Sequence, residues 1–179
     1  FLNNEFVGAK DYKVKMKWFD GVWSRFKPEI GKDRRGVTGV KKENLIDIGK
    51  KITQLPKNFN IHKTLIKIFV NKQKMFTQNH PIDWSTAESL AFATLLNDGF
   101  SVRLSGQDSG RGTFSQRHSV LRNQDSHERY IPLQHVSEKQ KNFEVIDSLL
   151  SELGVLGFEF GYSLSCLLYT SPSPRDRIA

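Results

Sequence analysis

The stretch VRLSGQDSGRGTFSQRH, residues 102–118, decides the fold of this chain. It opens with apolar residues on both sides of Arg103, as in a short strand, and Gly106 breaks the strand. A second short apolar run, residues 143–146, leads into DSLLSELGVLGFEFGYS, residues 147–163. The order strand, polar loop, strand and polar helix start predicts an α/β fold with a ligand site at the carboxyl ends of its strands.

Three helices are predicted ahead of the first strand. The first, Lys42–Leu55, has apolar residues at three- and four-residue steps and stops at Pro56. The second runs from about His62 to Phe76, and we expect both to pack on another part of a longer protein. The third begins at Ser85, where Ser85 and Glu88 have the spacing of a capping box. We also expect residues 1–39 to be loop-rich and residues 126–140 to form a surface excursion.

The run SGQDSGRGTFSQRH is long, unusual and punctuated by glycines. It resembles the pyrimidine-binding domain of thiamine-diphosphate enzymes, and more narrowly the decarboxylating component of the 2-oxoglutarate dehydrogenase complex. The similarity extends through residues 82–100, more loosely through residues 38–65, and stops after Ser165. The resemblance implies an α/β fold: a partial transketolase-like pyrimidine-binding domain, with a parallel sheet and flanking helices, preceded by a helical, basic connector.

The resemblance also suggests how the chain is organised. We expect a basic connector with two helices at 1–80 and the first part of the pyrimidine-binding domain at 81–165. The end of the chain, CLLYTSPSPRDRIA (166–179), resembles a translated sequencing adapter and is expected to be artefactual; the alternative is an ordinary extended tail. Because the chain begins with Phe1 rather than methionine, we expect an internal piece of a longer protein.

Charge is distributed unevenly along the chain. Residues 1–80 carry 18 Lys and Arg against 7 Asp and Glu, a net of +11, whereas residues 81–179 carry 9 against 12, a net of −3. A basic half in which Trp18 and Trp23 interleave with lysines leaves open a nucleic-acid-binding module. Packing against an acidic neighbour in the same protein is the favoured interpretation, because no nucleic-acid fold motif surrounds these aromatics.

Two classes of protein are disfavoured by composition. The single cysteine, Cys166, lies in the suspect tail, so no disulfide, thiolate-metal site or cysteine nucleophile is predicted. No apolar run approaches the roughly 18 residues that a membrane span requires. Bacterial cytoplasm is the favoured location, with the mitochondrial matrix as the alternative.

Glu152 is the strongest catalytic candidate. It lies at the start of a predicted helix, where the helix dipole alone would favour a carboxylate. Apolar neighbours should exclude water and let a carboxyl group exchange protons near neutrality; these are Leu149, Leu150, Leu153 and Val155. By resemblance, Glu152 matches the glutamate that thiamine enzymes place against the aminopyrimidine ring, where it protonates a ring nitrogen. It is therefore predicted to be both catalytic and cofactor-binding.

Polar residues of the decisive loop are the other candidates. Gln107 follows the strand directly, and by resemblance its amide contacts cofactor or substrate; stabilising a turn is the alternative. Arg111, Arg117 and His118 could bind a substrate carboxylate, but a salt-bridged set that orders the loop is the favoured interpretation. No residues have metal-ligand spacing, so no metal site is predicted.

The resemblance implies a function for the parent protein. That enzyme would decarboxylate 2-oxoglutarate with thiamine diphosphate and Mg²⁺, and pass the succinyl group to a lipoyl-bearing succinyltransferase in the tricarboxylic acid cycle. A homodimeric parent is expected, with Mg²⁺ bound outside this chain, and the chain alone is expected to be inactive and poorly folded. The alternatives are another thiamine-diphosphate 2-oxo acid dehydrogenase, using pyruvate or 2-oxoadipate, or a transketolase-like enzyme.

Overall fold

The computed structural model of the chain describes residues 2–11, 38–165 and 169–170. Its elements follow one another in the order α1 (Leu2–Asp11), α2 (Lys42–Ile52), α3 (Lys63–Thr77), α4 (Trp84–Asn97), β1 (Val102–Gly106), β2 (Leu121–Arg122), β3 (Arg129–Tyr130), the short 3-10 helix η3 (Pro132–Gln134), β4 (Phe143–Asp147), α5 (Glu152–Ser165) and β5 (Tyr169–Thr170). Helices come first along the chain, and the strands lie in its second half.

The predicted parallel sheet is confirmed. β1 pairs with β4 in parallel register, from Val102 opposite Phe143 to Gly106 opposite Asp147. β5 adds a short parallel pairing on the other side of β1, giving the strand order β4-β1-β5. A separate antiparallel pair, β2 and β3, forms a small hairpin.

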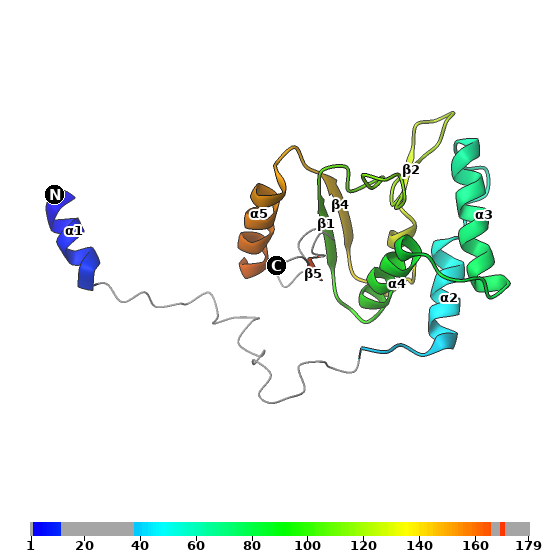
Figure 1. Cartoon of the computed structure of the whole chain (residues 1–179), viewed down its shortest axis with the longest axis horizontal. Helices are drawn as coiled ribbons and strands as arrows, with labels where there is room; N and C mark the ends of the chain where they lie inside the picture. The colour runs from blue at the N-terminus through cyan, green and yellow to red at the C-terminus, as the bar shows by residue number, and fades with distance from the viewer. Residues whose placement is uncertain (1, 12–37, 166–168, 171–179) are drawn as a thin grey trace.

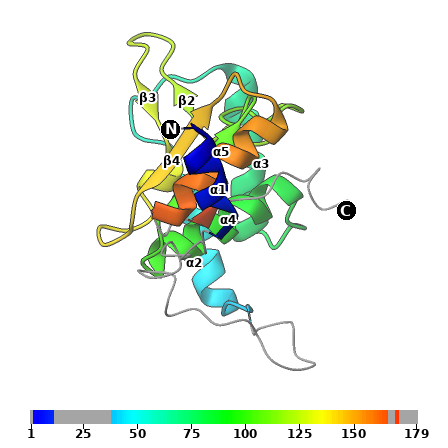
Figure 2. The same ribbon diagram turned by 90° about the vertical axis from the view of Figure 1, so that its left-hand side faces the viewer.

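Helices cover both faces of the sheet. Figure 1 shows α5 on one face and α4 on the other, with α2 and α3 beyond α4. Figure 2 gives the same arrangement from the α5 side, with the β2–β3 hairpin projecting at the top. This is the layered α/β architecture expected from the sequence.

The predicted helices are present with small differences at their ends. α2 ends three residues before the predicted limit, because Thr53 takes the C-cap position and its hydroxyl donates to the Gly49 carbonyl at 2.8 Å. The predicted cap of α4 was wrong. Asp83 caps the helix by accepting from the Thr86 N–H at 2.7 Å, and the Ser85 hydroxyl also donates to Asp83. An aspartate two residues earlier supplies the same acceptor as a serine, and it begins the helix sooner.

The main core joins α2, α3 and α4 to one face of the sheet. Both α2 and α3 contribute to it, with Ile48 and Ile52 from α2 and Phe76 from α3, so part of their apolar surface is buried within this chain. Their packing on another part of a longer protein stays a prediction. Residues 126–140 are also more than a surface excursion, because two of their side chains are buried in this core. Its members are Ile48, Ile52, Phe76, Leu90, Phe92, Ala93, Leu96, Val102, Leu104, Leu133, Val136 and Phe143. A smaller cluster lies under the hairpin, at Ile61, Phe69 and Leu121.

The ends of the chain are described only in part. The expectation of a loop-rich start was wrong over α1, which is helical from Leu2 to Asp11. Trp18 and Trp23 lie outside the described residues, as does most of the tail at 166–179, of which only Tyr169 and Thr170 are placed, in β5. None of the helices in the described ranges is long and apolar enough to cross a membrane.

Candidate functional site

The carboxyl ends of β1 and β4 and the start of α5 meet at one edge of the sheet (Figure 1). Two hydrogen bonds fasten this edge. The Ser148 N–H donates to the Gly106 carbonyl at 2.9 Å, and the Gly110 N–H donates to Asp147 Oδ1 at 2.8 Å. The loop that follows each strand is thereby held to its neighbour, and polar residues of the two loops share this edge, as predicted for an α/β site.

The loop after β1 turns sharply because several of its residues have positive φ. Gly106 and Gly112 have φ of 152° and 84°, and Asp108 has φ of 56°. A side chain at Gly112 would collide with Gln116, whose Oε1 lies 2.6 Å from the position of an added Cβ. This turn leaves Gln107 exposed at the edge of the sheet, where its amide can meet a ligand.

Glu152 is the first residue of α5, as predicted. Ser151 caps the helix, with the Gly154 N–H donating to its hydroxyl at 3.3 Å. The expected apolar enclosure is wrong for this chain: Glu152 is exposed, Leu149 is 101% exposed and Leu153 is 80% exposed. Val155 of α5 is buried against the sheet, whereas Leu153 on the same helix and Leu149 in the loop before it are exposed.

The two loop arginines take part in ion pairs. Arg117 donates through Nε to Glu88 Oε2 at 2.7 Å and through Nη1 to the Ser109 carbonyl at 2.8 Å. Arg111 is paired with Asp108, with Nε donating to Oδ2 at 3.1 Å. These contacts tie the loop to α4 and to itself, so both guanidinium groups are engaged within the protein.

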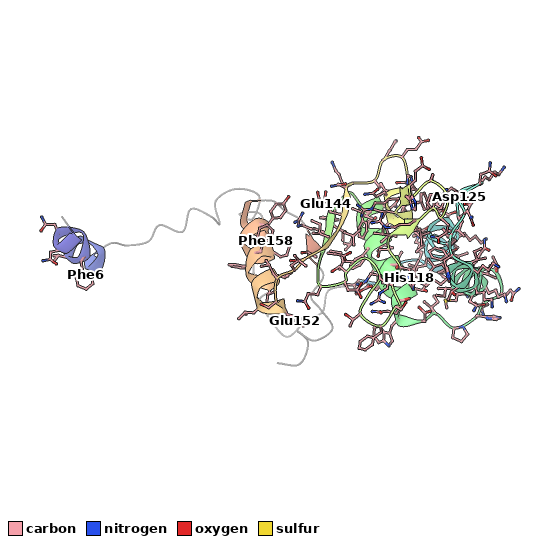
Figure 3. All side chains as sticks on the ribbon, turned by 90° about the horizontal axis from the view of Figure 1, so that it is seen from above. Phe6, His118, Asp125, Glu144, Glu152 and Phe158 are labelled. Carbon is pink, nitrogen blue, oxygen red and sulfur yellow. The ribbon has the colours of Figure 1, made fainter. Side chains whose placement is uncertain are left out.

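His118 lies away from Glu152. Figure 3 shows the two residues on opposite sides of the sheet, with Glu152 on α5. His118 is buried with φ of 50°, and its Nε2 lies 2.7 Å from the Ser115 carbonyl. Burial lowers the pKa of His118, and the nearby Lys72 and Arg111 add to that effect against the hydrogen bond to Ser115.

A small cavity adjoins His118. Its volume is about 30 Å³, room for a single water molecule. The buried Lys72 lines it, and Nζ lies 3.5 Å from the Gln116 carbonyl and 3.4 Å from that of Arg117. Burial lowers the pKa of Lys72, although Asp83 and Glu88 oppose the shift. Lys72 thus reaches the last residues of the loop from α3.

Sequence reasoning missed a cluster of charges under α5. Arg103, in β1, donates through Nε to both carboxylate oxygens of Glu159, at 3.0 and 3.1 Å, and it also pairs with Glu144 of β4. The ring of Tyr162 lies 4.6 Å from the guanidinium carbon. Burial by itself lowers the pKa of Arg103, but the hydrogen bonds and charges of Glu159 and Glu144 outweigh it and raise that pKa. The available signal was a charged residue inside an otherwise apolar strand.

The described part of the chain holds no group of three or more His, Cys, Asp or Glu side chains that could bind a metal ion. What the sheet edge does offer is an amide and a carboxylate, from Gln107 and Glu152. These groups can accept hydrogen bonds from, and donate them to, a heteroaromatic ring that carries both donor and acceptor atoms.

Comparison with known proteins agrees with this geometry. Residues 80–170 match the family described as the transketolase pyrimidine-binding domain. The match covers β1, β4 and α5, and it includes both Gln107 and Glu152. The chain belongs to this family.

The chain is also similar to individual curated proteins over most of its length. It is 48% identical over 167 residues to the 2-oxoglutarate dehydrogenase E1 component of Rickettsia felis, and 47% identical over 167 residues to that of Brucella anthropi. In both cases the similarity covers 92% of this chain and 17% of the relative. The chain therefore spans about one sixth of the length of these relatives.

Proposed function

We propose that residues 81–165 are the first part of the pyrimidine-binding domain of a thiamine-diphosphate-dependent 2-oxoglutarate dehydrogenase, and that residues 1–80 form the basic connector before it. The observation that carries the proposal is the similarity to the E1 components, which runs through 92% of the chain and includes both loops of the sheet edge. The carboxylate at the start of α5 is the group that would carry out the proposed proton transfer.

The residues present suit the pyrimidine end of thiamine diphosphate. An aminopyrimidine needs a carboxyl group at a ring nitrogen and apolar surface around the ring. Glu152 supplies the carboxyl group, and the exposed Leu149 and Leu153 beside it supply apolar surface that a ring could cover. The diphosphate and Mg²⁺ need a different donor set, which the proposal places outside the described residues.

Glu152 has the central role in the proposed mechanism. Its carboxyl group would hold a proton at the ring nitrogen and move it during the cycle, which is the work of a general acid–base. When bound, thiamine diphosphate supplies the carbon nucleophile and the electron sink for decarboxylation. Covering the exposed leucines would exclude water from this proton transfer.

Loop residues have supporting roles in the proposal. Gln107 would orient the cofactor or substrate through its amide. Arg111, Arg117 and His118 would hold the loop in shape rather than contact substrate, and the ion pairs to Asp108 and Glu88 support this division. A loop fixed at both ends keeps Gln107 in one place.

The complete enzyme would decarboxylate 2-oxoglutarate and transfer the succinyl group to a lipoyl group on a succinyltransferase partner. We place it in the bacterial cytoplasm as a homodimer. The names of the relatives, which are E1 components of 2-oxoglutarate dehydrogenase, support the substrate and the lipoyl-bearing partner of this proposal.

The test begins with the complete gene. Its coding sequence should be read on both sides of this segment, and the full-length product should be assayed for 2-oxoglutarate oxidation with an artificial electron acceptor. The expected result is turnover that requires thiamine diphosphate and that is faster with 2-oxoglutarate than with pyruvate or 2-oxoadipate. A full-length product that consumes none of these acids would refute the proposal.

A further inference from the structure

The charge cluster under α5 fixes the helix that carries Glu152. β1 alternates its side chains between the two faces of the sheet. Val102 and Leu104 are buried in the main core beneath α4, so Arg103 points to the opposite face, where α5 lies. Glu144 stands directly opposite Arg103 on β4 and shares that face.

Glu159 brings the helix into this cluster. It is 6% exposed, and its two carboxylate oxygens both accept from Arg103 Nε. The guanidinium group is therefore held by one strand neighbour and by one helix residue, from two directions. Such a bridge restricts the rotation of the helix as well as its distance from the sheet, because Nη1 anchors the guanidinium group to Glu144 of β4 while Nε holds Glu159 of α5.

The spacing along α5 links this bridge to the candidate catalytic residue. Glu159 follows Glu152 by seven residues, which is about two turns, so both lie on the same face of the helix about 10 Å apart. Val155 lies between them on the inner side and is buried. Rotating the helix at Glu159 would therefore swing Glu152 by the same angle.

The described apolar contact of α5 with the sheet is small. Among the described side chains of this helix, Val155 and Glu159 are buried. Several large apolar residues are instead exposed, at Leu153, Leu156, Phe158 and Phe160. The ion pair between Arg103 and Glu159 adds a directional contact that holds α5 on the sheet.

We propose that Arg103 and Glu159 are positioning residues for Glu152: the buried bridge between β1 and α5 sets the direction in which the Glu152 carboxyl group meets the cofactor. The proposal rests on the proposed function, because it assigns these residues to the same site. Neither residue touches the reacting atoms, and both act through the orientation of the helix.

The test uses the full-length enzyme and a readout other than turnover. The rate at which the C2 proton of bound thiamine diphosphate exchanges with solvent deuterium, followed by quenched-flow NMR, reports proton transfer directly. Arg103→Met should slow this exchange at least tenfold, because misplacing a reacting group by about 1 Å can cost about 100-fold. Glu159→Gln, which keeps the shape of the side chain, should slow the exchange by a smaller factor than Arg103→Met. The dissociation constant for thiamine diphosphate should change less than threefold in both.

A second variant distinguishes a misplaced Glu152 from an unfolded protein. Arg103→Met alone leaves the Glu159 charge buried without its partner, which can unfold the region. The double variant Arg103→Met with Glu159→Met removes both buried charges, keeps apolar bulk and leaves only Glu144, whose carboxylate is partly exposed. It should fold, and it should still slow the exchange at least tenfold. Lys51→Met is the matched control, because it breaks an exposed ion pair to Asp47 on α2 and should leave the rate within twofold.

A double-mutant cycle separates positioning from a general structural role. If Arg103 acts through Glu152, adding Arg103→Met and Glu159→Met to Glu152→Ala should slow the exchange by less than a further twofold. Full multiplication of the two losses would overturn the proposal, as would wild-type exchange in the folded Arg103→Met, Glu159→Met variant. An unsubstituted enzyme without thiamine-dependent turnover would instead refute the proposed function.

Discussion

Gly49 lies inside α2 at its contact with α3, and Gly49→Ala tests whether these two helices pack as described. A Cβ added at Gly49 would lie 2.3 Å from Cε1 of Phe76 and 2.4 Å from its Cδ1. The Phe76 ring is 7% exposed and belongs to the main core, so it cannot turn away into solvent. One of the two partners has to shift.

The expected net effect follows from two opposing terms. Forcing extra atoms into a packed core costs about 1–3 kcal/mol. Replacing glycine by alanine within a helix returns about 1 kcal/mol through helix propensity. Gly49→Ala should therefore lower the free energy of unfolding by up to roughly 2 kcal/mol, although the same substitution in an open helix would raise it.

Urea-induced unfolding of the purified chain, followed by far-ultraviolet circular dichroism, measures this difference. If the chain lacks a cooperative transition, amide hydrogen exchange of α2 and α3 in the full-length protein gives the same comparison. Gly157→Ala is the matched control, because an added Cβ at this helical glycine meets nothing within 4 Å. Phe76→Leu should remove most of the penalty of Gly49→Ala. Equal stabilisation by both alanine substitutions would refute the described packing.

Three further predictions concern residues around the loop and α4. Asp83→Ala should destabilise the chain by about 0.5–2 kcal/mol at pH 7 by removing the cap of α4, and Asp83→Asn should retain most of the stability. Burial tends to raise the pKa of Asp83, but hydrogen bonds from Thr86 and Ser85 outweigh it and lower that pKa. The stability contributed by ionised Asp83 should therefore be lost as pH falls below 3.8. Urea titrations at pH 2.5–5 would show this loss. Because the pKa of His118 is lowered in the folded chain, the imidazole is protonated at a higher pH in the unfolded chain than in the folded one. The free energy of unfolding should therefore fall as pH drops below 6.5. His118→Asn, in which asparagine tolerates the positive φ, should flatten that pH dependence. The purified chain should show no turnover of 2-oxoglutarate with thiamine diphosphate, and measurable turnover would show that residues outside it are dispensable.

Local sequence signals predicted the elements that depend on nearby residues. The periodic apolar faces of α2 and α3 and the alternation around Arg103 each lie within one short segment. So does the start of α5 at Glu152. Such patterns need no knowledge of distant partners, which is why the helices and both strands of the parallel pair were found close to their observed limits.

Features that depend on distant contacts were missed. Arg103 and Glu159 are 56 residues apart in the chain, and nothing near either residue marks the other as its partner. The burial of Leu133 likewise depends on where the connection between β3 and β4 crosses the core. The prediction that Glu152 is enclosed failed because residues close in sequence need not share one side of the helix. Val155 faces the sheet, whereas Leu153 is exposed.

The most direct test of the account is the effect of Glu152→Ala on the exchange of the thiamine diphosphate C2 proton in the full-length enzyme. A general acid–base contributes about 10²–10⁴-fold, so the account predicts exchange slowed by at least 100-fold, with Gly157→Ala as a helix control near the wild-type rate. Exchange in Glu152→Ala within twofold of the wild-type rate would contradict the assignment of Glu152 as the proton-transfer group.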